Sequence, residues 1–177
     1  QQVRDAVDAG APLVVGLDGI PRRMLDVVCP AVDTLFAAAT HDRSRVTVAV
    51  TLVNYADVIG AALDSVAAQQ LLDLDLVVVD DCSVDGGGAV VREWMERHAG
   101  RFGRCVLVRH PANAGLAAAR NQAFAMAATP YVFVLDADNL VYPRGLAKLR
   151  EDLLGDPEAA FAYGIIERFA EAGSLGL

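Results

Sequence analysis

Cysteine is scarce in this sequence, and its three copies, Cys29, Cys82 and Cys105, form no CxxC pair. This scarcity excludes a disulfide-stapled scaffold and a cysteine-based zinc site, and it favours free thiols in a reducing compartment. Apolar runs of about 18 residues are absent, so no transmembrane helix is predicted. Because a signal-peptide pattern is also missing, we expect a cytoplasmic chain, with a peripheral position at the inner face of the membrane left open.

Positive charge is scarce as well. The chain has 15 Lys and Arg against 23 Asp and Glu, which gives a formal net charge of −8, and Lys148 is its single lysine. Nucleic-acid binding needs clustered basic side chains that neutralise phosphates, so the composition argues against a nucleic-acid partner. Apolar residues make up 54% of the 177 residues. That share excludes a disordered chain and is enough for one buried core.

From residue 46 onward, short apolar runs alternate with segments of helical periodicity. Such alternation predicts right-handed βαβ units, hence an α/β fold whose mostly parallel sheet carries helices on both faces. We expect the first of these strands to lie between the second and the fourth, with the third beside the second. Strands are predicted at 46–53, 74–79, 105–108, 131–135 and 160–166, and helices at about 58–66, 90–98, 116–128 and 143–153.

Residues 1–45 have a different pattern. Apolar residues from Met24 to Phe36 recur at helical spacing, and Pro30 interrupts them. We interpret 1–45 as a linker or helical arm and 46–177 as the main domain. The chain starts on Gln1 rather than Met, and we expect it to be a piece of a longer protein.

The segment LDADN places Asp136 and Asp138 directly after a predicted strand. Two carboxylates at i and i+2 can turn toward one hard cation. Mg²⁺ and Mn²⁺ take one or two carboxylates together with water and substrate phosphate oxygens. The other interpretation is a solvated loop in which Asp138 caps a helix, and both stay open at this point.

A second acidic pair, Asp80 and Asp81, ends the strand in VVVDDCSVDGGG. These carboxylates can accept hydrogen bonds from a base or a ribose, whereas Ser83 and Asp85 fit turn and helix-capping positions better. The glycines that follow lack the Lys-Ser/Thr of a P-loop, and no GxGxxG follows the first strand. Neither of these nucleotide-binding fingerprints is therefore present.

Both acidic pairs are expected in one crevice. Ligands of open parallel sheets bind outside the carboxyl ends of the strands, and the predicted strand order places both pairs beside Asn54 and Tyr55. Arg120 follows the turn at 113–115 by one to two helical turns. From there it can pair with a carboxylate or hold a ligand phosphate.

Four segments together resemble the inverting family 2 glycosyltransferases of the GT-A fold, in the family's order over about residues 46–169. They are VTVAVTLVNYADVIGAALDSV, VVVDDCSVDGG, NAGLAAARNQA and FVLDADNLVYP. The resemblance implies a GT-A, Rossmann-like sheet that is incomplete toward the carboxyl terminus. It also implies sugar transfer with inversion from a nucleoside-diphosphate sugar, with a UDP-sugar as the expected donor, and Mg²⁺ or Mn²⁺ as the cofactor.

Carried over by position, the resemblance assigns roles to residues at the strand ends. Asp80 or Asp81 would contact the base and ribose, Asp138 would bind the metal with Asp136 beside it, and Arg120 would lie near the diphosphate. The donor nucleotide would be contacted by Leu52, Asn54, Asp80, Asp81, Arg120 and Asp136.

The acceptor side is less complete. In the family the catalytic base lies in an acceptor-binding region further along the chain, so we expect it beyond Leu177, and Glu167 is the one nearby acidic candidate. Val53 stands where the family often has Tyr, which would remove one stacking contact on the base. The implied partners are a carbohydrate, lipid or protein acceptor and other domains of the parent chain.

Two other functions fit parts of the pattern. One is a non-catalytic nucleotide-sugar-binding or regulatory module of the same fold, which a base motif further along the chain would argue against. The other is a receiver-type signalling domain with Asp136 as phosphate acceptor. A receiver needs its acidic pair after the first strand and a lysine at a strand end, whereas Lys148 falls in a predicted helix.

Overall fold

The computed structural model describes residues 33–39 and 46–167, which form one five-stranded sheet in the order β1-β4-β3-β2-β5. Four neighbouring strands are parallel, and β1 runs antiparallel to β4 at one edge. The predicted α/β fold and the order of its four parallel strands are confirmed. The strands are β1 (Asp33–Ala39), β2 (Val46–Leu52), β3 (Leu74–Asp80), β4 (Arg104–Arg109) and β5 (Tyr131–Asp136).

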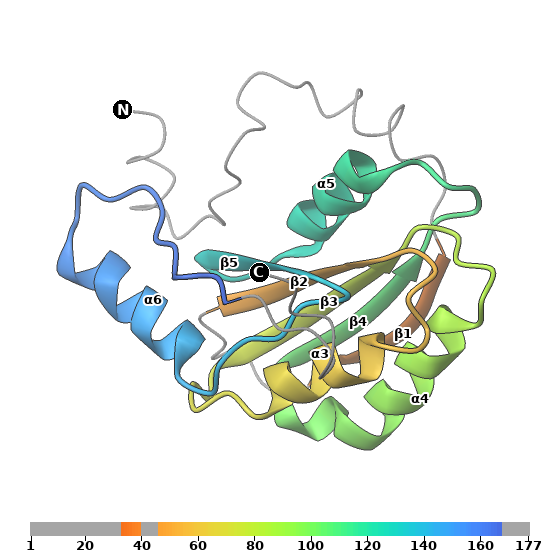
Figure 1. Ribbon diagram of the computed structural model, residues 1–177, viewed down its shortest axis with the longest axis horizontal. Coiled ribbons are helices and arrows are strands. Elements are labelled where there is room, and N and C mark those ends of the chain that lie inside the picture. The colour runs from red at the N-terminus through yellow and green to blue at the C-terminus, as the bar shows by residue number, and fades with distance from the viewer. Residues whose placement is uncertain (1–32, 40–45, 168–177) are drawn as a thin grey trace, which may run out of the picture.

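Helices cover both faces of this sheet. Figure 1 shows α3 and α4 on one face and α5 on the other, with α6 beside the β5 end. Each of the four helices predicted after residue 46 is present, with its ends shifted by a few residues. They are α3 (Ile59–Ala67), α4 (Gly87–His98), α5 (Leu116–Met126) and α6 (Gly145–Gly155), and a short 3-10 helix at Ala99–Arg101 follows α4. Within the described residues no helix is long and apolar enough to span a membrane.

Alternate residues of the central strands enter two separate cores. In β2, Val48 and Val50 pack in the core that α3 and α4 cover, whereas Ala49 packs in the core under α5. A strand buried on both faces needs apolar residues at every position rather than at every second one. This explains why β2 and β3 appear in the sequence as mostly apolar runs, with Thr47, Thr51 and Asp75 as buried polar exceptions.

The helix predicted through Phe36 is wrong in its described part, because residues 33–39 form β1. The register between β1 and β4 shifts between Thr34 and Phe36, and Leu35 and Phe36 both pack against the core. This bulge lets neighbouring apolar residues face the core, which imitates helical spacing in the sequence. β1 also pairs the open edge of β4. Residues 1–32, with the rest of the predicted arm and Cys29, lie outside the described residues, and the division of the chain at residue 46 stays a prediction.

The strand predicted at 160–166 is also wrong. This segment pairs with no strand among the described residues, and Ile165 and Ile166 are 98% and 91% exposed. Its β-rich composition predicted a strand, but a strand forms only where a neighbour can accept and donate its backbone hydrogen bonds.

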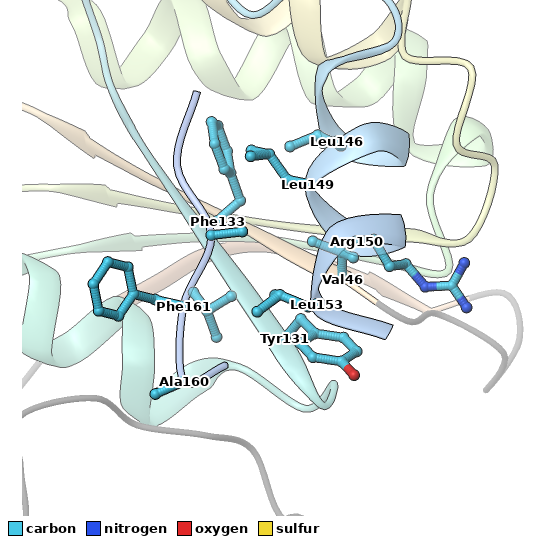
Figure 2. A pocket seen from close by; sticks show the side chains of 11 residues that line it. Val46, Tyr131, Phe133, Leu146, Leu149, Arg150, Leu153, Ala160 and Phe161 are labelled. Carbon is cyan, nitrogen blue, oxygen red and sulfur yellow. The ribbon is translucent and has the colours of Figure 1, made fainter. Parts of the chain in front are cut away.

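A groove of about 110 Å³ lies between β5, α6 and residues 160–162 (Figure 2). Its walls include Val46 and Tyr131, the first residues of β2 and β5. The groove is therefore at the amino ends of the parallel strands, opposite the end where the acidic pairs lie.

Candidate functional site

Strand pairing brings both acidic pairs to one edge of the sheet. Thr51 of β2 is paired with Asp136 of β5, and Leu52 is paired with Asp80 of β3. The end of β2 therefore lies between the two acidic segments, as the sequence predicted. We call this region, formed by the ends of β2, β3, β4 and β5 and the turns that follow them, the carboxyl edge.

Asp80 is fully buried within the carboxyl edge. Its Oδ1 accepts the backbone N–H of Ser83 at 2.8 Å, and its Oδ2 lies 3.6 Å from Nε of Arg109. The side chain of Leu52 is buried in the core as well. Both side chains are buried, so their assignment to the nucleotide stays a prediction.

Gly88, in the first turn of α4, leaves room for the buried carboxylate of Asp80. A Cβ at position 88 would lie 2.5 Å from Oδ2 of Asp80, and Asp80 is held by its bond to Ser83. We expect Gly88→Ala to lower the free energy of unfolding by about 1–3 kcal/mol, as overpacking does. The matched control is Gly60→Ala in α3, where a Cβ meets open space and alanine should add about 0.5–1 kcal/mol. Equal shifts of the urea midpoint in both variants would contradict this steric argument.

Hydrogen bonds to side chains connect the turns after β2 and β3. Asn54, in the left-handed region at φ 56°, donates its N–H to Oγ of Ser83 at 3.1 Å and accepts the N–H of Val84 through Oδ1 at 2.9 Å. Asp85 accepts N–H groups from Ala56 at 2.8 Å and Gly87 at 2.9 Å. Ser83 and Asp85 therefore hold the turns, as the sequence predicted.

These hydrogen bonds make the contribution of Asp85 depend on pH. The N–H of Ala56, followed by that of Gly87, lowers the pKa of Asp85 below its ordinary value of 3.8. Because the folded pKa is the lower one, the stabilisation is complete above pH 3.8 and is lost as the pH falls through the folded pKa. Asp85→Ala should therefore destabilise the chain at pH 7 and do so progressively less in acid. A difference in unfolding free energy that stayed constant with pH would contradict this role.

The second acidic segment combines one paired and one exposed carboxylate. Asp136 Oδ1 accepts a hydrogen bond from Nη2 of Arg120 at 2.8 Å, and both side chains are partly exposed, whereas Asp138 is exposed. Of the two interpretations of Arg120, the structure shows the pair with a carboxylate. Asp138 caps no helix, because α6 begins at Gly145.

These two carboxylates fit a hard cation of the Mg²⁺ or Mn²⁺ type. Such ions take one or two protein carboxylates and fill their other positions with water and phosphate oxygens. The described residues contain no cluster of three or more His, Cys, Asp or Glu that could form a metal site from protein side chains alone. A cation held by Asp136 and Asp138 would therefore need further ligands from water or from a bound phosphate.

The loop after Asp138 is held by buried Gln69, which follows the end of α3. Its Nε2 donates to the carbonyl oxygens of Val141 and Tyr142 at 3.2 and 2.8 Å, and its Oε1 accepts the N–H of Leu146 at 3.1 Å. Ser65 adds a bond from the N–H of Val141. This loop therefore leaves the carboxyl edge along a fixed path.

Glu167 accepts a hydrogen bond from Oη of Tyr142 in this same loop. The bond, together with the negative charge of Glu167, raises the pKa of the Tyr142 phenol. The structure therefore links the one acidic candidate near the end of the described residues to the loop that follows Asp138.

Asp81 and His110 form a pair that the sequence did not single out. Asp81 is buried, and its Oδ1 lies 2.7 Å from Nδ1 of buried His110. The available signal was positional: His110 directly follows β4 and so ends at the same edge as the acidic pairs.

Residues 47–176 match the family described as glycosyl transferase family 2. The chain belongs to this family. Membership confirms the resemblance drawn from the four sequence segments and makes the receiver-type alternative wrong. It leaves the acceptor undefined.

Relatives and solved structures agree with this assignment. The chain is 36% identical over 150 residues to the succinoglycan biosynthesis protein ExoU of Rhizobium meliloti, covering 78% of the chain and 42% of ExoU. Over 76% of the chain and 39% of that protein, it superposes on the mannosyltransferase PcManGT of Pyrobaculum calidifontis, solved with GDP-Man and Mn²⁺, with a TM-score of 0.59 and 32% identity. The chain spans less than half the length of either.

A more distant structure shares the fold. Residues 1–349 of TarS of S. aureus, solved in complex with UDP-GlcNAc, superpose with a TM-score of 0.56 at 24% identity over 63% of the chain and 31% of that fragment. Together with PcManGT, it shows that the sheet and its helices have the GT-A arrangement.

Proposed function

We propose that the chain is the donor-binding part of an inverting glycosyltransferase that uses a nucleoside-diphosphate sugar. The observation that supports this most is the strand register, which places Asp80 and Asp136 on either side of the end of β2 in a family 2 domain. The paired carboxylates suit the two ends of such a donor, with Asp81 at the nucleoside and Asp138 at the diphosphate. A UDP-sugar is our expected donor.

The negative charges of the carboxylates and of the diphosphate require a cation between them. Two carboxylates would repel a diphosphate, and a cation between them removes the repulsion. In this proposal Asp138, with Asp136 beside it, holds Mg²⁺ or Mn²⁺, which offsets the charge that develops on the departing nucleoside diphosphate. Arg120 already neutralises Asp136 and orients it at the edge of the sheet.

The acceptor half is proposed to lie outside this chain. Asp81 and Asp80 are buried and hydrogen-bonded, while Asp136 is paired with Arg120, so none is placed to take a proton from an acceptor hydroxyl. Transfer also needs the nucleophile within about 3–3.5 Å of the anomeric carbon. We therefore expect the chain alone to bind donor and to transfer sugar poorly, with the base and the acceptor site in the rest of a longer protein.

The test is calorimetric binding of UDP and GDP to the chain, with Mn²⁺ and with EDTA. If Mn²⁺ strengthens the binding of one nucleoside diphosphate, the proposal is supported. Equal affinities with metal and chelator would remove the metal role, and no binding of either nucleotide would remove the donor-binding function.

A radiolabelled donor assay then compares sugar transfer by the chain with transfer by the full-length protein. Full transfer by the chain, lost in Glu167→Gln, would show that the base is Glu167 and that the domain is complete.

A further inference from the structure

His110 is a fully buried histidine at the carboxyl edge that the function proposed above does not use. Its backbone N–H donates to the carbonyl oxygen of Asp80 at 2.9 Å, which continues the pairing of β3 and β4 by one residue. Its ring reaches Asp81, with Nδ1 at 2.7 Å from Oδ1. Because a carboxylate that holds backbone N–H groups can only accept, Nδ1 carries the proton of this bond.

The ring's other nitrogen argues against a purely structural purpose. Nε2 of His110 is buried and has no hydrogen-bond partner among the described residues. An unpaired buried polar atom costs about 1–3 kcal/mol, and an apolar side chain of similar size would avoid that cost. What the imidazole provides at this position is the Nδ1–H that it directs at Asp81.

The carboxylate of Asp81 also accepts hydrogen bonds from the backbone just before α5. Its Oδ1 also accepts the N–H of Ala114, and its Oδ2 accepts the N–H of Gly115, both at 2.8 Å. Gly115 has a φ of 88°, which disfavours any other residue, and it immediately precedes the helix. A carboxylate has about four acceptor sites, so three are filled by the protein and one remains, on Oδ2.

We propose that His110 is a positioning residue for nucleoside recognition, acting through Asp81. By filling an acceptor site on Oδ1, it fixes the rotation of the carboxylate, so that the remaining site on Oδ2 is presented to an N–H of the donor's base. This inference rests on the proposed function and adds the group that orients its nucleoside end.

Two variants at position 110 separate this role from simple packing. His110→Leu keeps most of the volume and removes the donor, whereas His110→Asn keeps an N–H donor near the place of Nδ1. Each folded variant is titrated by calorimetry with two probes in the presence of Mn²⁺: UDP, which has a base, and inorganic diphosphate, which has none. Folded fractions are matched by circular dichroism.

We expect His110→Leu to weaken UDP binding about tenfold, which corresponds to about 1.4 kcal/mol, with diphosphate affinity unchanged. The UDP affinity of His110→Asn should stay within about threefold of that of the wild type, a span of under 1 kcal/mol.

Unchanged UDP affinity in His110→Leu, or an equal loss of affinity for both probes, would overturn the inference. If His110→Leu does not fold, His110→Asn decides, because loss of UDP affinity in that variant would contradict the role of the donor. A wild type that binds diphosphate but not UDP would refute the proposed function itself, and the inference with it.

Discussion

Asp138→Ala should abolish the gain in UDP affinity that Mn²⁺ provides, so that the variant binds UDP equally well with metal and with EDTA. Asp138 is the exposed carboxylate of the second acidic segment, whereas Asp136 is already paired with Arg120. Removing the freer of the two proposed ligands would leave the cation with one charge-compensated carboxylate. We expect a loss of about tenfold or more in Mn²⁺-dependent affinity, or at least about 1.4 kcal/mol, measured by calorimetry.

The matched control for this result is Glu96→Ala, which removes an exposed carboxylate from α4. It changes the net charge by the same amount as Asp138→Ala and should leave the Mn²⁺ effect intact. If both variants lost the same share of the effect, general electrostatics rather than coordination would explain it. Retention of the full Mn²⁺ effect in Asp138→Ala would remove this residue from the proposed metal site.

Arg101→Met should lower the free energy of unfolding by about 2–4 kcal/mol, the largest effect on stability that we expect. The guanidinium donates to four carbonyl oxygens at and after the end of α3: those of Ala67, Gln69, Leu71 and Leu72, at 2.7–2.9 Å. Hydrogen bonds from a charged group contribute about 1.5–3 kcal/mol each when measured singly, and bonds that share one donor group do not add fully. Urea unfolding at pH 7 measures the loss.

Arg97→Met is the control for Arg101→Met. Arg97 is exposed on α4 and makes one hydrogen bond, to the carbonyl oxygen of Glu93 at 3.2 Å. Its substitution should change stability by less than about 0.5 kcal/mol, as is usual for a surface position. A similar loss in both variants would show that the carbonyl cluster around Arg101 contributes little.

The parallel part of the fold could be predicted because each central strand is buried on both faces. That burial favours runs that are apolar at most positions, and the acidic and glycine residues that follow them mark the strand ends. β1 and residues 160–166 could not be predicted in the same way. Whether such a segment is a strand depends on a partner far away in the sequence, which is present for β1 at β4 and absent for 160–166 within the described residues.

The candidate site shows a similar division. The meeting of the two acidic pairs followed from strand order alone, and the turn roles of Ser83 and Asp85 followed from residue type. The burial of Asp80 did not, because it depends on how the turn after β3 and the start of α4 pack around its carboxylate. The pairing of Asp81 with His110 did not either, because it depends on how the turn after β4 folds back over the end of β3. The neighbours of a polar residue in a turn are set by tertiary packing, which periodicity does not report.

The most direct test of the account is to map where a nucleotide binds on the ¹⁵N-labelled chain by amide chemical shifts, with UDP and Mg²⁺ added stepwise. We predict that the shifts gather at the carboxyl edge, at Asn54, Asp81, Gly115 and Asp138. The groove at the opposite end of the sheet, around Tyr131, should stay unchanged. Shifts that gathered at that groove, or no shifts at saturating UDP, would contradict the claim that the carboxyl edge binds a nucleoside-diphosphate donor.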